Sequence, residues 1–440
     1  MARIDDSSFL GEESIGRILL KIAPPVMAAQ LIQAFYNIAD SYFIGGYSND
    51  ALTALSVIYP IQLLIIAFAT GTGVGVNTLM AKYYAIKKLR RADETGGTGM
   101  VLSVIIWAIF ALLSFIFMES YVCTSASSLD AIEYAVTYGN IVCIGSIGSF
   151  LEGNWTKVHQ SHGNMRLPMI AQIAGALTNI ILDPVMIYGF GFIPEMGVTG
   201  AGWATVIGQC VAAFIVAPGG IRKLPKFKTG LLYAAKIYKL GYPSILMQAL
   251  YTVYIVVLNV ILAEFSDAAV TVLGLYYKMQ TFFFIPLMGL QVCIVLVLSY
   301  NYTCYRFDRC KKTMNYSFII SAAFMLFGIV CFVFFPKTIM GLFSSSAEVM
   351  EIGSIAFPII GTSFISAVFS LILPVFFQAI GNGRISLLLS LTRQIFCLMP
   401  IFWLLSLIGL NYTWLAYPIS ETIAGGIGLL LYKKVTKFWD

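Results

Sequence analysis

The sequence predicts an all-α polytopic membrane protein, with twelve transmembrane helices in two pseudo-symmetric six-helix lobes around a central cleft. Its 440 residues are 59% hydrophobic and only 11% charged, whereas soluble domains carry about 25% charged residues. Apolar segments recur along the whole chain, and about 20 apolar residues are enough for one helical span. These runs are too long, and alternate too little, for the strands of a membrane barrel. The second half also repeats the first, which predicts the two lobes.

The apolar segments define twelve candidate spans. Several are longer than a bilayer requires, which indicates tilt or extension beyond the membrane. In chain order the spans cover residues 18–44, 51–81, 97–118, 129–160, 166–188, 198–217, 235–264, 268–302, 314–335, 347–380, 384–408 and 411–433.

Charges in the connecting loops predict the orientation of these spans. Basic residues gather in alternate loops, at 87–91, 166, 222–228, 306–312 and 384. The opposite loops are acidic, and Lys337 is their only basic residue. Because basic loops stay in the cytoplasm, we expect both termini there and the protein in the inner (cytoplasmic) membrane. The net charge of +6 follows from these loops and does not predict a nucleic-acid partner.

The two halves match when the first is shifted by 218 residues. Pro25 then falls on Pro243 and, much later, Gly163 falls on Gly381. The expected domains are an N-lobe, a cytoplasmic linker and a C-lobe, at residues 1–217, 218–234 and 235–440. Transporters built from parallel repeats hold the substrate between the halves and work by alternating access.

The repeat also shows where the halves differ. Asp40 corresponds to Leu258 and Asp183 to Ile401, so a pair of carboxylates is present in the first half only. By chain position both acids lie a few residues from the external ends of their spans. A charged side chain inside a membrane span is costly, and it marks a candidate functional site.

Asn179 and Thr205 complete a candidate cation site with these two acids. Asn179 and Asp183 are four residues apart and share a helix face, and Thr205 lies at a similar depth in the next span. An all-oxygen set of ligands suits a hard cation such as Na⁺, and two nearby carboxylates in an apolar setting also hold a proton. The alternative is structural: Asp183 caps or kinks its helix at Pro184, and Asp40 bonds only its neighbours.

The second half has charges of its own. Lys278, Arg393 and Glu421 each lie about ten residues into a span, roughly 15 Å deep at 1.5 Å per residue. Since an unpaired charge is unfavourable there, we favour a pair of Glu421 with either Arg393 or Lys278. One positive charge is then left over, which an anionic or zwitterionic substrate would use.

Four runs of sequence carry a more specific signal, at 37–45, 163–169, 179–189 and 197–205. They closely resemble the multidrug and toxic compound extrusion (MATE) family, and the run Asn-Ile-Ile-Leu-Asp-Pro at 179–184 is the most specific of them. The likeness covers essentially the whole chain. It implies two six-helix lobes around a central cleft that exports organic molecules in exchange for Na⁺ or H⁺. An acid pair without a carboxylate early in span 7 looks more like the DNA-damage-inducible-F-like (DinF-like) branch than the NorM-like branch.

The resemblance also implies roles for single residues. In the DinF-like branch the matching positions form a cation site in the first lobe, here Asp40, Asn179, Asp183 and Thr205. The residues expected to contact the substrate are Gln33, Tyr36, Asn37, Lys278, Arg393 and Glu421, of which Gln33 and Tyr36 match positions beside the family's drug pocket. One departure is that the loops after spans 2 and 8 lack the family's Gly-Ala-Gly-Asp-like turn.

Two functions remain open from the sequence. The first is a cation-coupled antiporter for drugs and organic compounds, and the alternative is a lipid or lipid-linked oligosaccharide flippase of the same superfamily. A flippase needs several basic residues for phosphate, whereas Lys278 and Arg393 are opposed by three acids, which favours the antiporter. An enzyme is not expected, since no nucleophile–base set stands out. We expect a monomer in the bilayer, no cofactor besides the coupling ion, and small organic substrates.

The orientation is testable by labelling single introduced cysteines from outside intact cells. We predict that a cysteine near Asp130 or Glu348 is labelled, because these loops are expected to be external, and that one in the loop around Arg222 is not. Labelling of the Arg222 loop before permeabilisation would contradict the topology.

Overall fold

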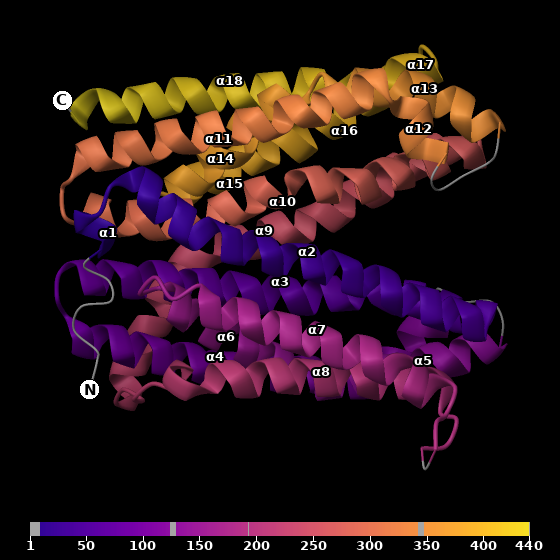
Figure 1. Cartoon of the computed structure of the whole chain (residues 1–440), viewed down its shortest axis with the longest axis horizontal. Helices are drawn as coiled ribbons and strands as arrows, with labels where there is room; N and C mark the ends of the chain where they lie inside the picture. The colour runs from indigo at the N-terminus through magenta and orange to yellow at the C-terminus, as the bar shows by residue number, and fades with distance from the viewer. Residues whose placement is uncertain (1–8, 124–128, 192, 342–346, 440) are drawn as a thin grey trace. The chain divides into compact units, whose positions relative to one another are not determined.

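Figure 1 shows the computed structural model, which describes residues 9–123, 129–191, 193–341 and 347–439. Every regular element in these residues is a helix. The elements are α1 (Phe9–Glu12), α2 (Ile15–Tyr47), α3 (Asn49–Ala85), α4 (Leu89–Cys123), α5 (Leu129–Gly145), α6 (Ile147–Gln160), α7 (Arg166–Ile187), α8 (Gly197–Gly220), α9 (Phe227–Ala263), α10 (Asp267–Thr303), α11 (Phe307–Phe334), α12 (Pro336–Gly341), α13 (Ala347–Gly361), α14 (Phe364–Ala379), α15 (Gly383–Leu391), the π-helix η1 (Thr392–Leu398), α16 (Met399–Ser406), α17 (Leu410–Thr413), α18 (Ala416–Thr436) and the 3₁₀-helix η2 (Lys437–Trp439).

Among the described residues, eleven helical segments are long and apolar enough to cross a membrane. The bent pair α13 and α14, with 55° between its axes, makes a twelfth span if the two helices cross together. The predicted class, an all-helical polytopic membrane protein, is therefore confirmed. Some helices start well before the predicted apolar span; α4 begins at Leu89 rather than near 97. Its first turns are polar, and they hold the Arg90–Glu94 ion pair, so apolar character alone missed them.

The sequence repeat is visible in the backbone itself. Ser48 and Ser266, 218 residues apart, each cap the helix that follows, with Oγ 3.1 and 3.2 Å from a backbone nitrogen of the first turn. Lys87 and Tyr305 have the same spacing and nearly the same positive φ, 55° and 57°. These two turns, which lack the family's glycines, thus keep the left-handed conformation that glycine adopts most easily. The halves share their turn geometry as well as their helix order.

The chain divides into two compact units. Unit 1 contains residues up to Phe9 and Pro24–Gln248, and unit 2 contains Leu10–Ala23 and Ala249–Asp440. Two long helices therefore belong to both units: α2 changes unit at Pro24, and α9 changes unit after Gln248. The lobe bounds expected from sequence, 1–217 and 235–440, stay a prediction.

The first part of α9 is part of the core of unit 1. Its Tyr233 and Ile237 pack with Val76 and Met80 of α3 and with Val158 of α6. All five side chains are buried. Because each fully buried aliphatic or aromatic side chain stabilises by about 1.5–3 kcal/mol, this contact fixes residues 227–248 on unit 1.

The N-terminal segment is fixed to unit 2 by hydrogen bonds to its carbonyl groups. Asn301 and Arg309 both donate to the carbonyl oxygen of Leu10 at 3.0 Å, and Arg306 donates to that of Gly11 at 2.6 Å. A helix as short as α1 leaves its last carbonyls without partners, and these side chains supply them. The beginning of α2 is therefore held at the turn between α10 and α11.

Candidate functional site

Two carboxyl groups of unit 1 lie in direct contact. Asp40 comes from α2 and Asp183 from α7, and both are buried, with 9% and 0% of their surface exposed. Their side chains lie within hydrogen-bonding reach of each other. Oδ1 of Asp40 has no hydrogen-bond partner among the described residues. Two ionised carboxylates this close repel each other strongly, so the pair needs a shared proton or a bound cation.

Asn179 links this pair to α8. Its amide nitrogen lies 3.3 Å from Oδ1 of Asp183 and 3.4 Å from Oγ1 of Thr205. With the amide turned over, the nitrogen donates to Oδ2 of Asp183 at 3.0 Å and the oxygen accepts from the backbone N–H of Thr205 at 3.1 Å, so both ends are satisfied. Both Asn179 and Thr205 are buried. The four residues predicted as cation ligands thus form one cluster, while their role as ligands stays a prediction.

Glycines set the distance between α7 and α8 at this cluster. A Cβ atom on Gly208 would lie 2.7 Å from the carbonyl oxygen of Gly175 and 3.2 Å from Cβ of Asn179. Even alanine would therefore push the two helices apart. Pro184, directly after Asp183, stays inside α7, where its missing N–H leaves one carbonyl of the preceding turn without a helical donor.

Sequence reasoning missed two members of the cluster. Tyr138 of α5 is buried, and its hydroxyl accepts a hydrogen bond from Gln62 of α3 at 3.2 Å. Tyr138 also interacts with Thr205, which in turn bonds Tyr36 of α2. A glutamine in the middle of an apolar span was the available signal, but nothing in its spacing relates it to Tyr138.

The other predicted substrate contacts of unit 1 are less defined. Gln33 is exposed on α2, one turn before Tyr36, which is half-buried. The side chain of Asn37 lies outside the part of the chain that the structure describes. The expected role of Gln33 rests on its sharing a helix face with Tyr36 and Asp40.

In unit 2 the predicted ion pair forms between Arg393 and Glu421, with Nη1 and Oε1 3.0 Å apart. The expectation that Lys278 is also buried was wrong, since this side chain is exposed. Two residues turn a helix by roughly 200°, so the burial of Tyr276 puts Lys278 on the opposite face of α10. Depth in a span did not tell which way the side chain points.

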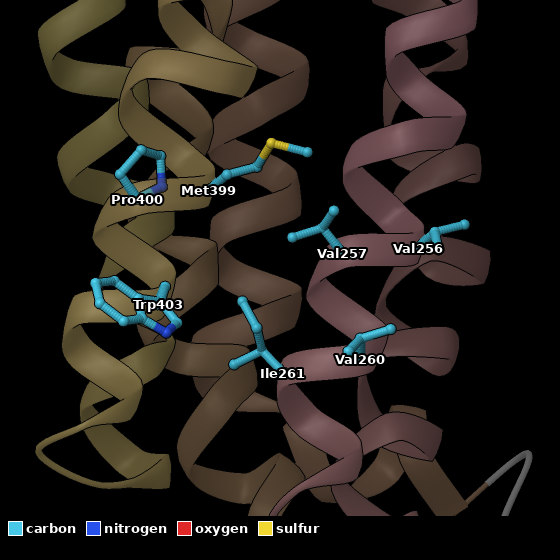
Figure 2. A pocket seen from close by; sticks show the side chains of 7 residues that line it. All are labelled: Val256, Val257, Val260, Ile261, Met399, Pro400 and Trp403. Carbon is cyan, nitrogen blue, oxygen red and sulfur yellow. The ribbon is translucent and has the colours of Figure 1, made fainter.

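Unit 2 also has an apolar groove between α9 and α16, with a cavity volume of about 440 Å³ (Figure 2). Val257 and Ile261 point across it toward Met399 and Trp403, whereas Val256 points away. No charged side chain lines the groove. It provides shape and apolar surface but no group that could hold an ion.

At the positions that correspond to the acid pair, unit 2 is apolar. Leu258 is fully buried in its core, and Ile401 packs against the same core. The positions that correspond to the acid pair therefore hold no carboxyl group in unit 2. Carboxylates, an amide and hydroxyls are the donors that bind a hard cation, and this set can also hold a proton.

A family model described as MatE matches residues 25–185 and 243–424. The chain belongs to the MatE family. Its members are membrane transporters and not enzymes, and this match does not favour the flippase alternative. The two matched stretches begin at Pro25 and Pro243, which agrees with the repeat of 218 residues.

This MatE transporter is similar in sequence to the multidrug export protein MepA of Staphylococcus haemolyticus, with 23% identity over 97% of this chain and 95% of the relative. It is also similar to an FAD transporter of Shewanella oneidensis, with 24% identity over 93% of each chain.

The fold of this MatE transporter matches a solved outward-facing conformation of a multidrug resistance MATE family transporter of the MOP superfamily. The TM-score is 0.91 at 21% identity, covering 99% of this chain and 98% of that one. A MOP superfamily transporter from Pyrococcus furiosus, described as having a binding pocket of reverse polarity, matches with a TM-score of 0.90, 21% identity and 98% coverage of each chain. At these identities the likeness shows the fold alone.

The helix contact at Gly208 gives a stability prediction. We expect Gly208→Ala to destabilise the MatE transporter by about 1–3 kcal/mol, because overpacking forces the neighbouring atoms to shift. Thermal unfolding in detergent measures this effect. Gly426→Ala in α18 is the matched control: its Cβ would meet nothing within 4 Å, and alanine is the better helix former by about 1 kcal/mol. Equal unfolding temperatures for the two variants would contradict the close contact.

Proposed function

We propose that this MatE transporter is a cation-coupled antiporter. It exports drugs and other organic compounds by alternating access, in exchange for Na⁺ or H⁺. The family match supports a transporter, and the names of the MepA relatives support drug export. The observation that supports cation coupling is the buried contact between Asp40 and Asp183. Two carboxylates this close bind a cation or a proton, because either one neutralises their mutual repulsion.

The coupling ion acts by neutralising this pair. Na⁺ would take oxygen ligands from both carboxylates, from Thr205 and from Asn179 once its amide oxygen turns inward. A proton would instead bridge the two carboxyl groups. Either ion removes net negative charge beside Tyr36, whose helix also carries Asp40. Charge is thus lost at the place where we propose that α2 contacts the substrate.

Binding of the substrate and binding of the cation then oppose each other, and α2 couples the two. Neutralisation lets α2 repack or bend near Pro24 and Pro25, which shrinks the substrate pocket and expels the substrate to the outside. Such coupling is reciprocal, and it typically amounts to about 1–3 kcal/mol, or about 5–150-fold in affinity. The two ligands need not share any atom of the site.

Several finer points belong to the same proposal. The acid pair confined to unit 1 supports the DinF-like branch. The basic alternate loops support the cytoplasmic membrane with both termini inside. We propose a monomer, with the bilayer and small organic molecules as its partners and no resident cofactor.

Neutralising the acid pair tests the function directly. Asp40→Asn and Asp183→Asn are each expected to abolish dye efflux from proteoliposomes under an imposed Na⁺ or H⁺ gradient. The residual dye binding should lose its response to pH and Na⁺, because the mutant no longer binds or releases the coupling ion. Asp130→Asn, at an exposed acid on α5, is the matched control and should export like the wild type. Normal gradient-driven export by Asp40→Asn would rule out this acid as the coupling group.

A further inference from the structure

The buried ion pair of unit 2 is only partly satisfied within the protein. Glu421 is held twice: Oε1 accepts from Arg393 at 3.0 Å, and Oε2 accepts a short hydrogen bond from Ser370. Arg393 is held once. A guanidinium group carries five N–H donors, and among the described residues Glu421 is its one hydrogen-bond partner.

The remaining donors of Arg393 are accessible. The side chain keeps 14% of its surface exposed, and Glu421 keeps 10%. Each nitrogen of Arg393 is therefore either hydrogen-bonded or accessible at the surface. A guanidinium deep in a membrane span cannot leave its N–H groups in lipid, so an accessible one must face water or a polar ligand.

Aromatic hydroxyl groups surround this charge. Arg393 interacts electrostatically with Tyr254, Tyr276 and Tyr417. The hydroxyls of Tyr417 and Tyr277 are 2.9 Å apart, and the rings of Tyr276 and Tyr417 are in edge contact with centroids 5.2 Å apart. Tyr254, Tyr276 and Tyr417 are buried, whereas Tyr277 is half-buried. Tyr277 therefore keeps part of an aromatic face that a substrate ring can contact.

The local helix geometry is also unusual at this point. Arg393 lies in the π-helix Thr392–Leu398, between the α-helices α15 and α16. Gln394 next to it is buried, and its side-chain oxygen has no partner among the described residues. Wide π-turns are rare and occur often at functional sites, because they redirect side chains that an α-helix would place elsewhere.

We infer that Arg393 recognises an anionic group, carboxylate or phosphate, of an aromatic substrate, and that Glu421 occupies the guanidinium when no substrate is bound. The inference rests on the proposed export function and names the substrate class: aromatic anions and zwitterions. A carboxylate or phosphate matches the planar fork of arginine with two hydrogen bonds, whereas Glu421 uses one. The incoming anion therefore binds the open edge of Arg393, and Glu421 is its internal competitor.

This arrangement predicts opposite effects for the two members of the pair. Removing Arg393 removes the anion's partner. Removing the charge of Glu421 removes its competitor, so an anionic substrate binds more tightly. A purely structural ion pair would instead respond in the same way to the loss of either member.

The test is equilibrium binding of two dyes to purified protein in lipid nanodiscs, without an ion gradient. The probes are a rhodamine with a free carboxylate and the methyl ester of the same dye. Wild type should prefer the carboxylate. Arg393→Gln should raise the dissociation constant of the carboxylate dye by about tenfold or more, in line with a lost charged hydrogen bond. It should change the dissociation constant of the ester by less than about twofold, because the ester forms no such bond. Glu421→Gln should strengthen carboxylate binding.

The double variant Arg393→Gln with Glu421→Gln is the control for misfolding of the single variants, because it leaves no unpaired charge at this site. It should bind the two dyes equally. Retention of the carboxylate preference by the double variant, or equal losses for both dyes in Arg393→Gln, would overturn the inference. Since no gradient is applied, failure of cation coupling at Asp40 leaves these results unchanged. The two proposals can therefore fail separately.

Discussion

The proposed coupling depends on the repulsion between two carboxyl groups that the fold of unit 1 forces into contact. Asp40 and Asp183 come from helices far apart in the chain, and neither is exposed enough for water to screen it. The close approach of α7 and α8 at Gly208 brings Thr205 next to Asn179, one turn before Asp183. A pair in this position is stable only with a proton or a cation, which is why we propose that the site binds the ion of the transport cycle.

Helix α2 connects this chemistry to the rest of the chain. Its first residues belong to unit 2, where Arg309 and its neighbours hold the carbonyl groups of the N-terminal segment, and from Pro24 onward it belongs to unit 1. Asp40 lies near the other end of the same helix. Helix α9 has the reciprocal arrangement, changing unit after Gln248. A change of charge at Asp40 thus acts on a helix whose beginning belongs to unit 2 and whose remainder belongs to unit 1, with Pro24 and Pro25 at the change of unit.

The sequence predicted what depends on local spacing and on the repeat. Helix order, the contact of Asn179 with Asp183 and the absence of acids at the corresponding positions of unit 2 all follow from such patterns. What depends on how spans face one another was not predictable. Tyr138 reaches the site through long-range packing, and Lys278 was misjudged because depth in a span leaves the direction of the side chain open. The exchange of α2 and α9 between the units has no signature in hydrophobicity either.

The most direct measurement is infrared difference spectroscopy of the protonated-carboxyl stretch. In Na⁺-free buffer at neutral pH, wild type should show one buried carboxylic acid, and adding Na⁺ or alkali should remove its band. Asp40→Asn should lose this response, because the single remaining acid has no partner with which to share a proton. Absence of the band in wild type, or an unchanged response in Asp40→Asn, would contradict a shared proton or cation at the pair.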